Sequence, residues 1–137
     1  MDNLFEDILS SYSEKLEQLL NQPTHKFSEA TLTQVPEVSG VYVIHENSSK
    51  QIIYAGRRRN LRARLLQQHK RGNIRGSQFR KAIGQKYNLE SEMKIPDYVL
   101  TTCSFQFLPV ESFAEMVRLE HFIKAILAPT LNIQLKQ

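Results

Sequence analysis

The amino-acid sequence predicts an α/β fold of the α+β type, in which helices flank a small antiparallel three-stranded sheet. Apolar residues recur with helical period near both ends of the chain, over residues 3–20 and 111–127. Between them lie short β-branched and aromatic runs at 41–44 and 52–55, separated by a polar turn that is typical of a hairpin. At 137 residues, with 41% hydrophobic residues, the chain suits one compact core.

The first helix, capped by Asp2 and followed by Pro23, is expected to bury one apolar face. Residues 23–38 show little periodicity and predict an irregular connection. We therefore expect an N-terminal amphipathic helix and connection over residues 1–38. This part would pack on a main domain over residues 39–137, so that the whole chain forms one compact unit.

Two basic helices, a third strand and a long amphipathic helix are expected after the hairpin. Asn60 can cap the first basic helix, and Ser77 can cap the second, which continues to about Lys86. The segment 98–108 contains the apolar and aromatic residues of the third strand. The last helix stops at Pro129. Its apolar positions are Phe113, Met116, Val117, Phe122, Ile123, Ile126 and Leu127.

The net charge of +4 conceals a strong asymmetry in where the charges lie. Residues 57–86 hold eleven Lys and Arg and no acidic residue, whereas the rest of the chain carries a net charge of −7. Exposed positive charge at this density favours binding to a nucleic acid over the alternative of a solvated, self-repelling helix surface. The positions expected to contact phosphates are Arg57, Arg58, Arg59, Arg62, Lys70, Arg71, Arg75, Arg80 and Lys81.

The sequence also predicts where the protein resides. Cys103 is alone, which excludes an internal disulfide and a cysteine-based zinc site. No apolar stretch reaches the length of a membrane span, and the acidic start of the chain resembles neither a secretory signal nor a transit peptide. We therefore expect a cytoplasmic protein that does not enter membranes.

Five short motifs lie along the chain over roughly residues 39–133. They are Gly40-Val41-Tyr42, Tyr54-Ala55-Gly56, Asn60-Leu61-Arg62-Ala63-Arg64-Leu65, Leu119-Glu120-His121 and Pro129-Thr130-Leu131-Asn132. The first two are tripeptides of the hairpin, and the other three are an arginine-bearing helix, a glutamate in the long helix and a closing segment with an asparagine. In this order the motifs resemble the GIY-YIG nuclease superfamily, with Val and Ala in place of the isoleucines of the family name.

The resemblance implies metal-dependent hydrolysis of phosphodiester bonds. Glu120 would hold Mg²⁺ or Mn²⁺, since carboxylate oxygens are hard donors. Arg64 would contact the scissile phosphate, and Tyr54 a phosphate or the attacking water. Either Tyr42 or His69 would accept the proton of that water. The residues that the resemblance implies in catalysis are Tyr42, Tyr54, Arg64, His69, Glu120 and Asn132.

Each of these residues also has a purely structural interpretation. Most strand tyrosines only pack, His69 could interact with a helix dipole, and Glu120 could be a solvated helix residue. A phenol with a pKa of about 10 is a weak base at neutral pH, so Tyr42 would need positive charge beside it. Asn132 would support the Glu120 region by hydrogen bonds.

These observations predict a metal-dependent endonuclease that hydrolyses DNA phosphodiester bonds in one step, on duplex or branched DNA. One such site cuts one strand, so cutting both strands would require a homo-oligomer or two binding events. Two alternatives stay open. One is a catalytically inactive nucleic-acid-binding module of the same fold. The other is an RNA-binding protein, which would need exposed aromatic residues to stack on bases.

Overall fold

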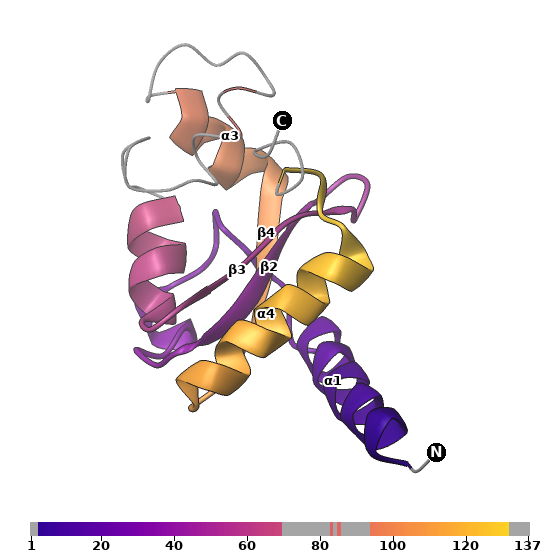
Figure 1. Cartoon of the computed structure of the whole chain (residues 1–137). Coiled ribbons are helices and arrows are strands. Elements are labelled where there is room, and N and C mark those ends of the chain that lie inside the picture. Colours follow the sequence, from indigo (N-terminus) through magenta and orange to yellow (C-terminus); the bar gives the residue numbers. More distant parts are fainter. Residues whose placement is uncertain (1–2, 70–82, 84, 86–93, 132–137) are drawn as a thin grey trace.

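The structure is a computed structural model of the chain, and it describes residues 3–69, 83, 85 and 94–131 (Figure 1). It confirms the predicted α+β class. No helix among these residues combines the length and the apolar character that crossing a bilayer requires. The elements are α1 (Leu4–Leu20), β1 (His25–Lys26), the 3-10 helix η1 (Leu32–Gln34), β2 (Gly40–Glu46), β3 (Ile52–Arg58), the π-helix η2 (Ala63–His69), α3 (Lys94–Thr102), β4 (Cys103–Pro109) and α4 (Phe113–Leu127).

The described part of the chain forms a sheet of four strands rather than the predicted three. Their order is β1-β4-β2-β3, and each neighbouring pair is antiparallel. The additional strand, β1, lies in the segment 23–38, which the sequence predicted to be an irregular connection. It pairs His25 with Phe105 and Lys26 with Ser104. Two residues are too few to produce a periodic pattern, so this strand forms only because β4 supplies its pairing partner.

The predicted hairpin is confirmed, and both strands extend beyond the runs that predicted it. β2 lies inside the sheet, and β3 forms one edge. Tyr42 pairs with Gly56, and Ile44 pairs with Tyr54. After the pair Ile44 and Tyr54 the register shifts: His45 pairs with Ile52, and Ile53 is not paired with a residue of β2. This irregularity places both Ile53 and Tyr54 in the same hydrophobic cluster, although they are neighbours in the strand.

Helices cover both faces of the sheet (Figure 1). On one face, α1 and α4 pack over a cluster formed by Leu16, Leu19, Val41, Val43, Ala55, Met116, Leu119 and Ile123. On the other face, η2 and α3 pack over a cluster that includes Phe27, Tyr42, Leu65, Val99 and Phe105. The edge strand β3 therefore lies between η2 on one face and α4 on the other.

Helix α3 was not predicted. The sequence predicted a strand over 98–108, but only the part from Cys103 onward is a strand, because α3 takes the residues before it. Val99 is buried in the core from this helix. The hydroxyl of Tyr98 donates a hydrogen bond to Glu46 at 3.1 Å. These packing contacts outweigh the β propensity of the residues, a preference that is weak on its own.

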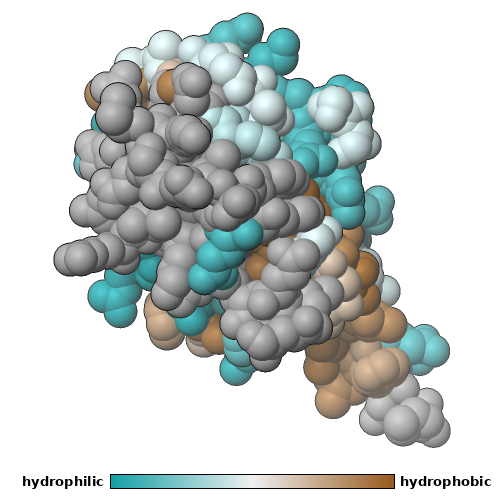
Figure 2. All heavy atoms as spheres, turned by 90° about the horizontal axis from the view of Figure 1, so that it is seen from above, coloured by the Kyte–Doolittle hydropathy of each residue, from teal (hydrophilic) through white to brown (hydrophobic). Residues whose placement is uncertain are grey.

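Helix α1 is confirmed, but its apolar stripe is buried only toward its C-terminal end. There Gln106 of β4 donates hydrogen bonds to the carbonyl oxygens of Leu20 and Gln22, both at 2.8 Å. The first half of α1 extends away from the sheet, and Figure 2 shows apolar surface on that side of the molecule. The helix is longer than the surface it packs on, so the expected burial of the whole stripe is wrong. The exposed apolar residues are Leu4, Phe5, Ile8 and Leu9.

A side chain at Gly40 would have no room, because β2 and β4 approach closely there. A Cβ atom would overlap the carbonyl oxygen of Leu108 and lie 2.8 Å from Cδ1 of Leu61. Since a paired backbone carbonyl cannot move aside, Gly40→Ala should lower the free energy of unfolding by about 1–3 kcal/mol in urea denaturation. Val38→Ala, at an exposed position, should change it by less than about 0.5 kcal/mol. Equal stability of Gly40→Ala and wild type would contradict this packing.

Candidate active site

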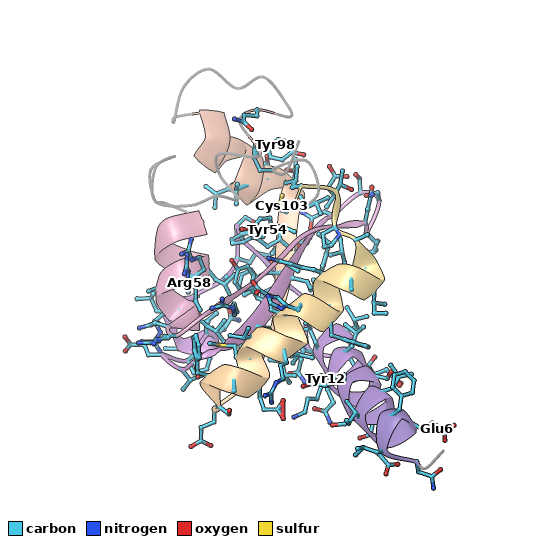
Figure 3. All side chains as sticks on the ribbon, in the orientation of Figure 1. Glu6, Tyr12, Tyr54, Arg58, Tyr98 and Cys103 are labelled. Atoms are coloured by element: carbon cyan, nitrogen blue, oxygen red, sulfur yellow. The ribbon has the colours of Figure 1, made fainter. Side chains whose placement is uncertain are left out.

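A cavity of about 150 Å³ lies at the edge strand β3, between η2 and α4. Four residues predicted to be catalytic line it, and each comes from a different element. These are Tyr42 of β2, Tyr54 of β3, Arg64 of η2 and Glu120 of α4. Figure 3 shows Tyr54 and Arg58 in this region, both projecting from β3. The complete lining is Tyr42, Tyr54, Gly56, Arg57, Arg58, Arg64, Glu120 and Lys124.

The alternation of side chains along β3 sends two neighbouring arginines to opposite faces of the sheet. Arg57 pairs with Val41 and shares the face covered by α4, where its Nε donates to Oε1 of Glu120 at 3.0 Å. Arg58 pairs with Gly40 and lies on the η2 side, as Figure 3 shows. The cavity therefore extends past the end of β3, and one arginine lines it from each face of the sheet.

Tyr42 and Tyr54 lie side by side on the η2 face of the sheet, with ring centroids 6.4 Å apart. Both side chains are buried. Gly56, which pairs with Tyr42, leaves room for its ring. A Cβ atom at Gly56 would lie 2.6 Å from Oη and 2.8 Å from Cζ of Tyr42. The glycine of the second tripeptide is therefore required by the tyrosine of the first.

Burial and neighbouring charges set the protonation of the tyrosines. Burial raises the pKa of Tyr42 well above its usual value, Tyr54 raises it further, and Arg64 and Arg58 oppose the shift. The pKa of Tyr54 is also raised, chiefly by burial. Burial lowers the pKa of Arg64. Near neutral pH both phenols are protonated, so Tyr42 can act as a base only when further positive charge lies beside it.

η2 places Arg64 at the cavity while leucines anchor the helical segment in the core. The side chain of Asn60 accepts a hydrogen bond from the backbone N–H of Ala63 at 3.0 Å, which confirms the predicted cap. Leu61 and Leu65 are fully buried. Arg64 is only 6% exposed. Its guanidinium is consequently fixed by the packing of the surrounding segment rather than free to move in solvent.

Arg62, one of the positions that the sequence predicts to contact nucleic acid, makes contacts within the protein. Its Nε donates to the carbonyl oxygen of Val35 at 2.7 Å, and its Nη1 lies 3.3 Å from Oε1 of Glu37. These contacts connect the segment that carries Arg64 to the loop before β2. Arg62 therefore holds the helical segment in place, whereas Arg57 and Arg58 line the cavity.

Glu120 lies on the inner side of α4 and is 8% exposed. Its two carboxylate oxygens pair with two cations: Oε1 is 3.0 Å from Nε of Arg57, and Oε2 is 3.2 Å from Nζ of Lys124. The spacing of four residues places Lys124 on the same helix face, a signal that the sequence analysis missed. Among the described residues, Glu120 is the one carboxylate at this cavity, and no group of three or more His, Cys, Asp or Glu could hold a metal.

The two other residues predicted to be catalytic are His69 and Asn132. Asn132 lies outside the described residues, and the structure describes His69 only as the last position of η2. The second basic helix also lies outside them, except for Ile83, which is helical and buried, and Gln85. The basic positions outside the described part are Lys70, Arg71, Arg75, Arg80 and Lys81.

The family model of the GIY-YIG catalytic domain matches residues 24–137, a range that includes all the described strands. The chain belongs to the GIY-YIG family. The resemblance carried by the five motifs is thereby confirmed, and the domain is of the nuclease class. Helix α1 precedes the matched range.

Two crystal structures of the GIY-YIG N-terminal endonuclease domain of UvrC from Thermotoga maritima are similar to this GIY-YIG chain. One is a tyrosine-to-phenylalanine mutant and the other an asparagine-to-alanine mutant, each bound to its catalytic divalent cation. Both are 20% identical to this chain and cover 73% of it and 88% of the UvrC chain, with TM-scores of 0.43 and 0.41. No curated protein sequence matches the chain.

The contact between Tyr42 and Gly56 of this GIY-YIG domain predicts an energetic coupling between the two positions. Gly56→Ala places a methyl group against the hydroxyl and ring of a buried tyrosine, and should lower the free energy of unfolding by about 1–3 kcal/mol. Because Tyr42→Phe removes the atom in closest contact, Gly56→Ala should lower the free energy of unfolding by less when it is made in the Tyr42→Phe protein. A double-mutant cycle in urea measures the coupling. Additive effects would show that the hydroxyl does not lie against Gly56.

Proposed function

We propose that this GIY-YIG protein is a divalent-metal-dependent endonuclease that hydrolyses DNA phosphodiester bonds in one step. The observation that carries the proposal is the convergence of Tyr42, Tyr54, Arg64 and Glu120 on one cavity, from four separate elements. Hydrolysis requires an aligned water, an acceptor for its proton, positive charge at the phosphate and assistance for the leaving oxygen. The cavity offers a candidate for each of these requirements.

Positive charge at the phosphate would come from Arg64 and Arg58. Arg64 is buried and held by its helical segment, so it is preorganised for a charge-assisted contact with a phosphate oxygen. Arg58 is exposed at the end of β3 and can meet a DNA backbone that crosses the mouth of the cavity. The protonated hydroxyl of Tyr54 can donate a hydrogen bond to a phosphate oxygen or orient the attacking water.

Tyr42 is the proposed acceptor of the water proton, and His69 is the second candidate. The raised pKa of Tyr42 works against this role, and the charges of Arg64 and Arg58 already oppose that rise. His69 follows Arg64 by five residues at the end of η2, and an imidazole accepts a proton at neutral pH without such assistance.

Glu120 is the proposed ligand of Mg²⁺ or Mn²⁺, because a carboxylate oxygen suits both ions. When bound, such a cation would neutralise phosphate charge and assist the leaving oxygen. Its two oxygens pair with Arg57 and Lys124 in this structure, so a divalent cation would have to displace at least one of these side chains. With one carboxylate at the cavity among the described residues, water and phosphate oxygens would complete the coordination shell.

The proposed partner is duplex or branched DNA, bound by the basic positions around the cavity. A single cavity acts on one strand, so cleavage of both strands would require two copies of the chain or two binding events. The proposed location is the cytoplasm, as the sequence predicts.

One observation favours a second function, a nucleic-acid-binding module without hydrolytic activity. Both oxygens of Glu120 are already paired, with Arg57 and with Lys124. A carboxylate whose charge is neutralised within the protein holds a metal less strongly. Cleavage of supercoiled plasmid in Mg²⁺ or Mn²⁺ separates the two functions, because the module would bind the plasmid and leave it intact.

Glu120→Gln should abolish hydrolysis and leave DNA binding nearly unchanged, because arginines rather than Glu120 supply the affinity. Plasmid nicking and a gel-shift assay measure the two properties separately. Glu111→Gln, an exposed position just before α4, is the matched control and should cleave at the wild-type rate. Cleavage by Glu120→Gln at near the wild-type rate would rule out the proposed metal ligand.

If Tyr42 accepts the water proton, Tyr42→Phe should lower the single-turnover rate by roughly two to four orders of magnitude, the range typical of general acid–base catalysis. His69→Ala should then lower the single-turnover rate much less. If His69 is the base, the order reverses, and the wild-type rate should fall below a pH of about 6.5 as the imidazole becomes protonated. A Tyr42→Phe enzyme within a few-fold of wild type would end the tyrosine proposal.

Arg57→Ala should strengthen divalent-cation binding to the free protein, because it removes one of the cations that compete for Glu120. Since the pair is partly exposed, the expected gain in Mn²⁺ affinity is only about 2- to 5-fold in calorimetry. Arg118→Ala, at an exposed arginine of the same helix, should leave the affinity unchanged. An unchanged affinity in Arg57→Ala would mean that Arg57 does not compete with the metal.

A further inference from the structure

We propose that Phe113 is a stacking platform for an unpaired base of the DNA substrate, beside the proposed active site. The inference rests on the proposed function and specifies which kind of DNA the site takes. Phe113 is the first residue of α4 and is 52% exposed. In the sequence it is one of the apolar positions of this amphipathic helix, but in the structure it is not buried.

A single exposed phenylalanine needs no explanation, but the surroundings of Phe113 are unusual. The guanidinium carbons of Arg57 and Arg59 lie 5.5 and 5.4 Å from the centre of its ring. A second cavity of about 360 Å³ brings the ring together with four arginines. Proteins that bind single-stranded nucleic acid combine arginines with an aromatic ring. The arginines hold the phosphates, and a base stacks on the ring.

The charge around Phe113 also argues against an apolar protein partner. Docking a hydrophobic surface here would remove water from several arginines, which is costly unless each gains an anionic partner. A nucleotide can cover the apolar ring and also give an arginine an anionic partner, because its base stacks on the ring and its phosphate pairs with the guanidinium. Arg59, which contacts the ring, and Arg58, which lines the same cavity, are both exposed and could turn toward such a phosphate.

Arg57 joins this platform to the proposed catalytic cavity. Its Nε donates to Glu120 at 3.0 Å, and its guanidinium carbon lies 5.5 Å from the ring centre of Phe113. The two cavities also share Arg58 and Arg64 in their linings. One side chain thus spans the distance between ring and carboxylate. A base stacked on Phe113 would therefore belong to a nucleotide close to the scissile phosphate.

A base inside a duplex has both faces covered by its neighbours, so it cannot lie on Phe113 unless it leaves the stack. Leaving the stack costs least where the base is already unpaired, as in a flap, a branch point or a single strand. Stacking on an aromatic ring does not discriminate among the bases, since every base has a flat face. The platform thus gives the site a preference for DNA structure, with little preference for sequence.

The affinity of two DNAs tests this preference. In a Glu120→Gln background, which prevents cleavage, Phe113→Ala should weaken binding of a flap oligonucleotide by about 5- to 100-fold, the effect of losing one base–aromatic stack. Binding of a blunt duplex should change less than 2-fold. Phe113→Tyr should bind the flap like wild type, and Phe113→Leu, which keeps apolar volume without the flat ring, should behave like Phe113→Ala. Phe5→Ala, at another exposed phenylalanine, should change neither affinity.

A fluorescence measurement reports stacking directly. The chain contains no tryptophan, so Phe113→Trp introduces a single reporter. Its emission should be quenched on adding the flap oligonucleotide and much less on adding the blunt duplex. Phe5→Trp, on the projecting part of α1, should respond to neither DNA. Equal quenching by flap and duplex, or equal loss of affinity for both in Phe113→Ala, would overturn the platform.

The outcomes for the platform and for the proposed function are distinguishable. Quenching that is specific to the flap, in a protein that cleaves no DNA with Mg²⁺ or Mn²⁺, would support the platform and refute the nuclease. Cleavage of DNA that is unaffected by Phe113→Ala, with no quenching in Phe113→Trp, would support the nuclease and refute the platform. Urea denaturation of each variant verifies that it is folded.

Discussion

The pairing of Tyr42 with Gly56 across β2 and β3 is the contact on which the rest of the site depends. It fixes the register of the hairpin, and the register decides which face each side chain occupies. A slip of one residue would turn Tyr54 toward α4 and exchange the directions of Arg57 and Arg58. The absence of a side chain at Gly56 is what allows the ring of Tyr42 to lie across β3 at this register.

A second constraint follows from where the register places Arg57. Glu120 is nearly buried, and a carboxylate in that environment is costly unless its charge is compensated. Arg57 and Lys124 compensate it, one for each oxygen. The same two side chains occupy the atoms that a divalent cation would use. With Glu120 in its proposed role as metal ligand, compensation of its buried charge and binding of a cation would make opposite demands on this side chain.

The sequence predicted those features that local contacts produce, such as the hairpin, the long helix and the cap at Asn60. The predictions from sequence failed where contacts between residues far apart in the chain determine the local structure. Val99 has strand propensity yet is buried from a helix, and β1 is too short to show a period. Motif order identified four residues that share the cavity. It could not show that Arg57 pairs with Glu120, because 63 positions separate them, nor that Phe113 is exposed.

Arg57 is the residue through which the parts of the site are connected. It contacts Glu120 on one side and the ring of Phe113 on the other. A phosphodiester that enters the cavity would offer this guanidinium a third partner, with a full negative charge like that of Glu120. Drawing Arg57 toward the phosphate would release an oxygen of Glu120 and uncover a face of the ring. Because such coupling is reciprocal, a cation bound at Glu120 would in turn leave Arg57 available for DNA, so that cation and DNA would each strengthen the binding of the other.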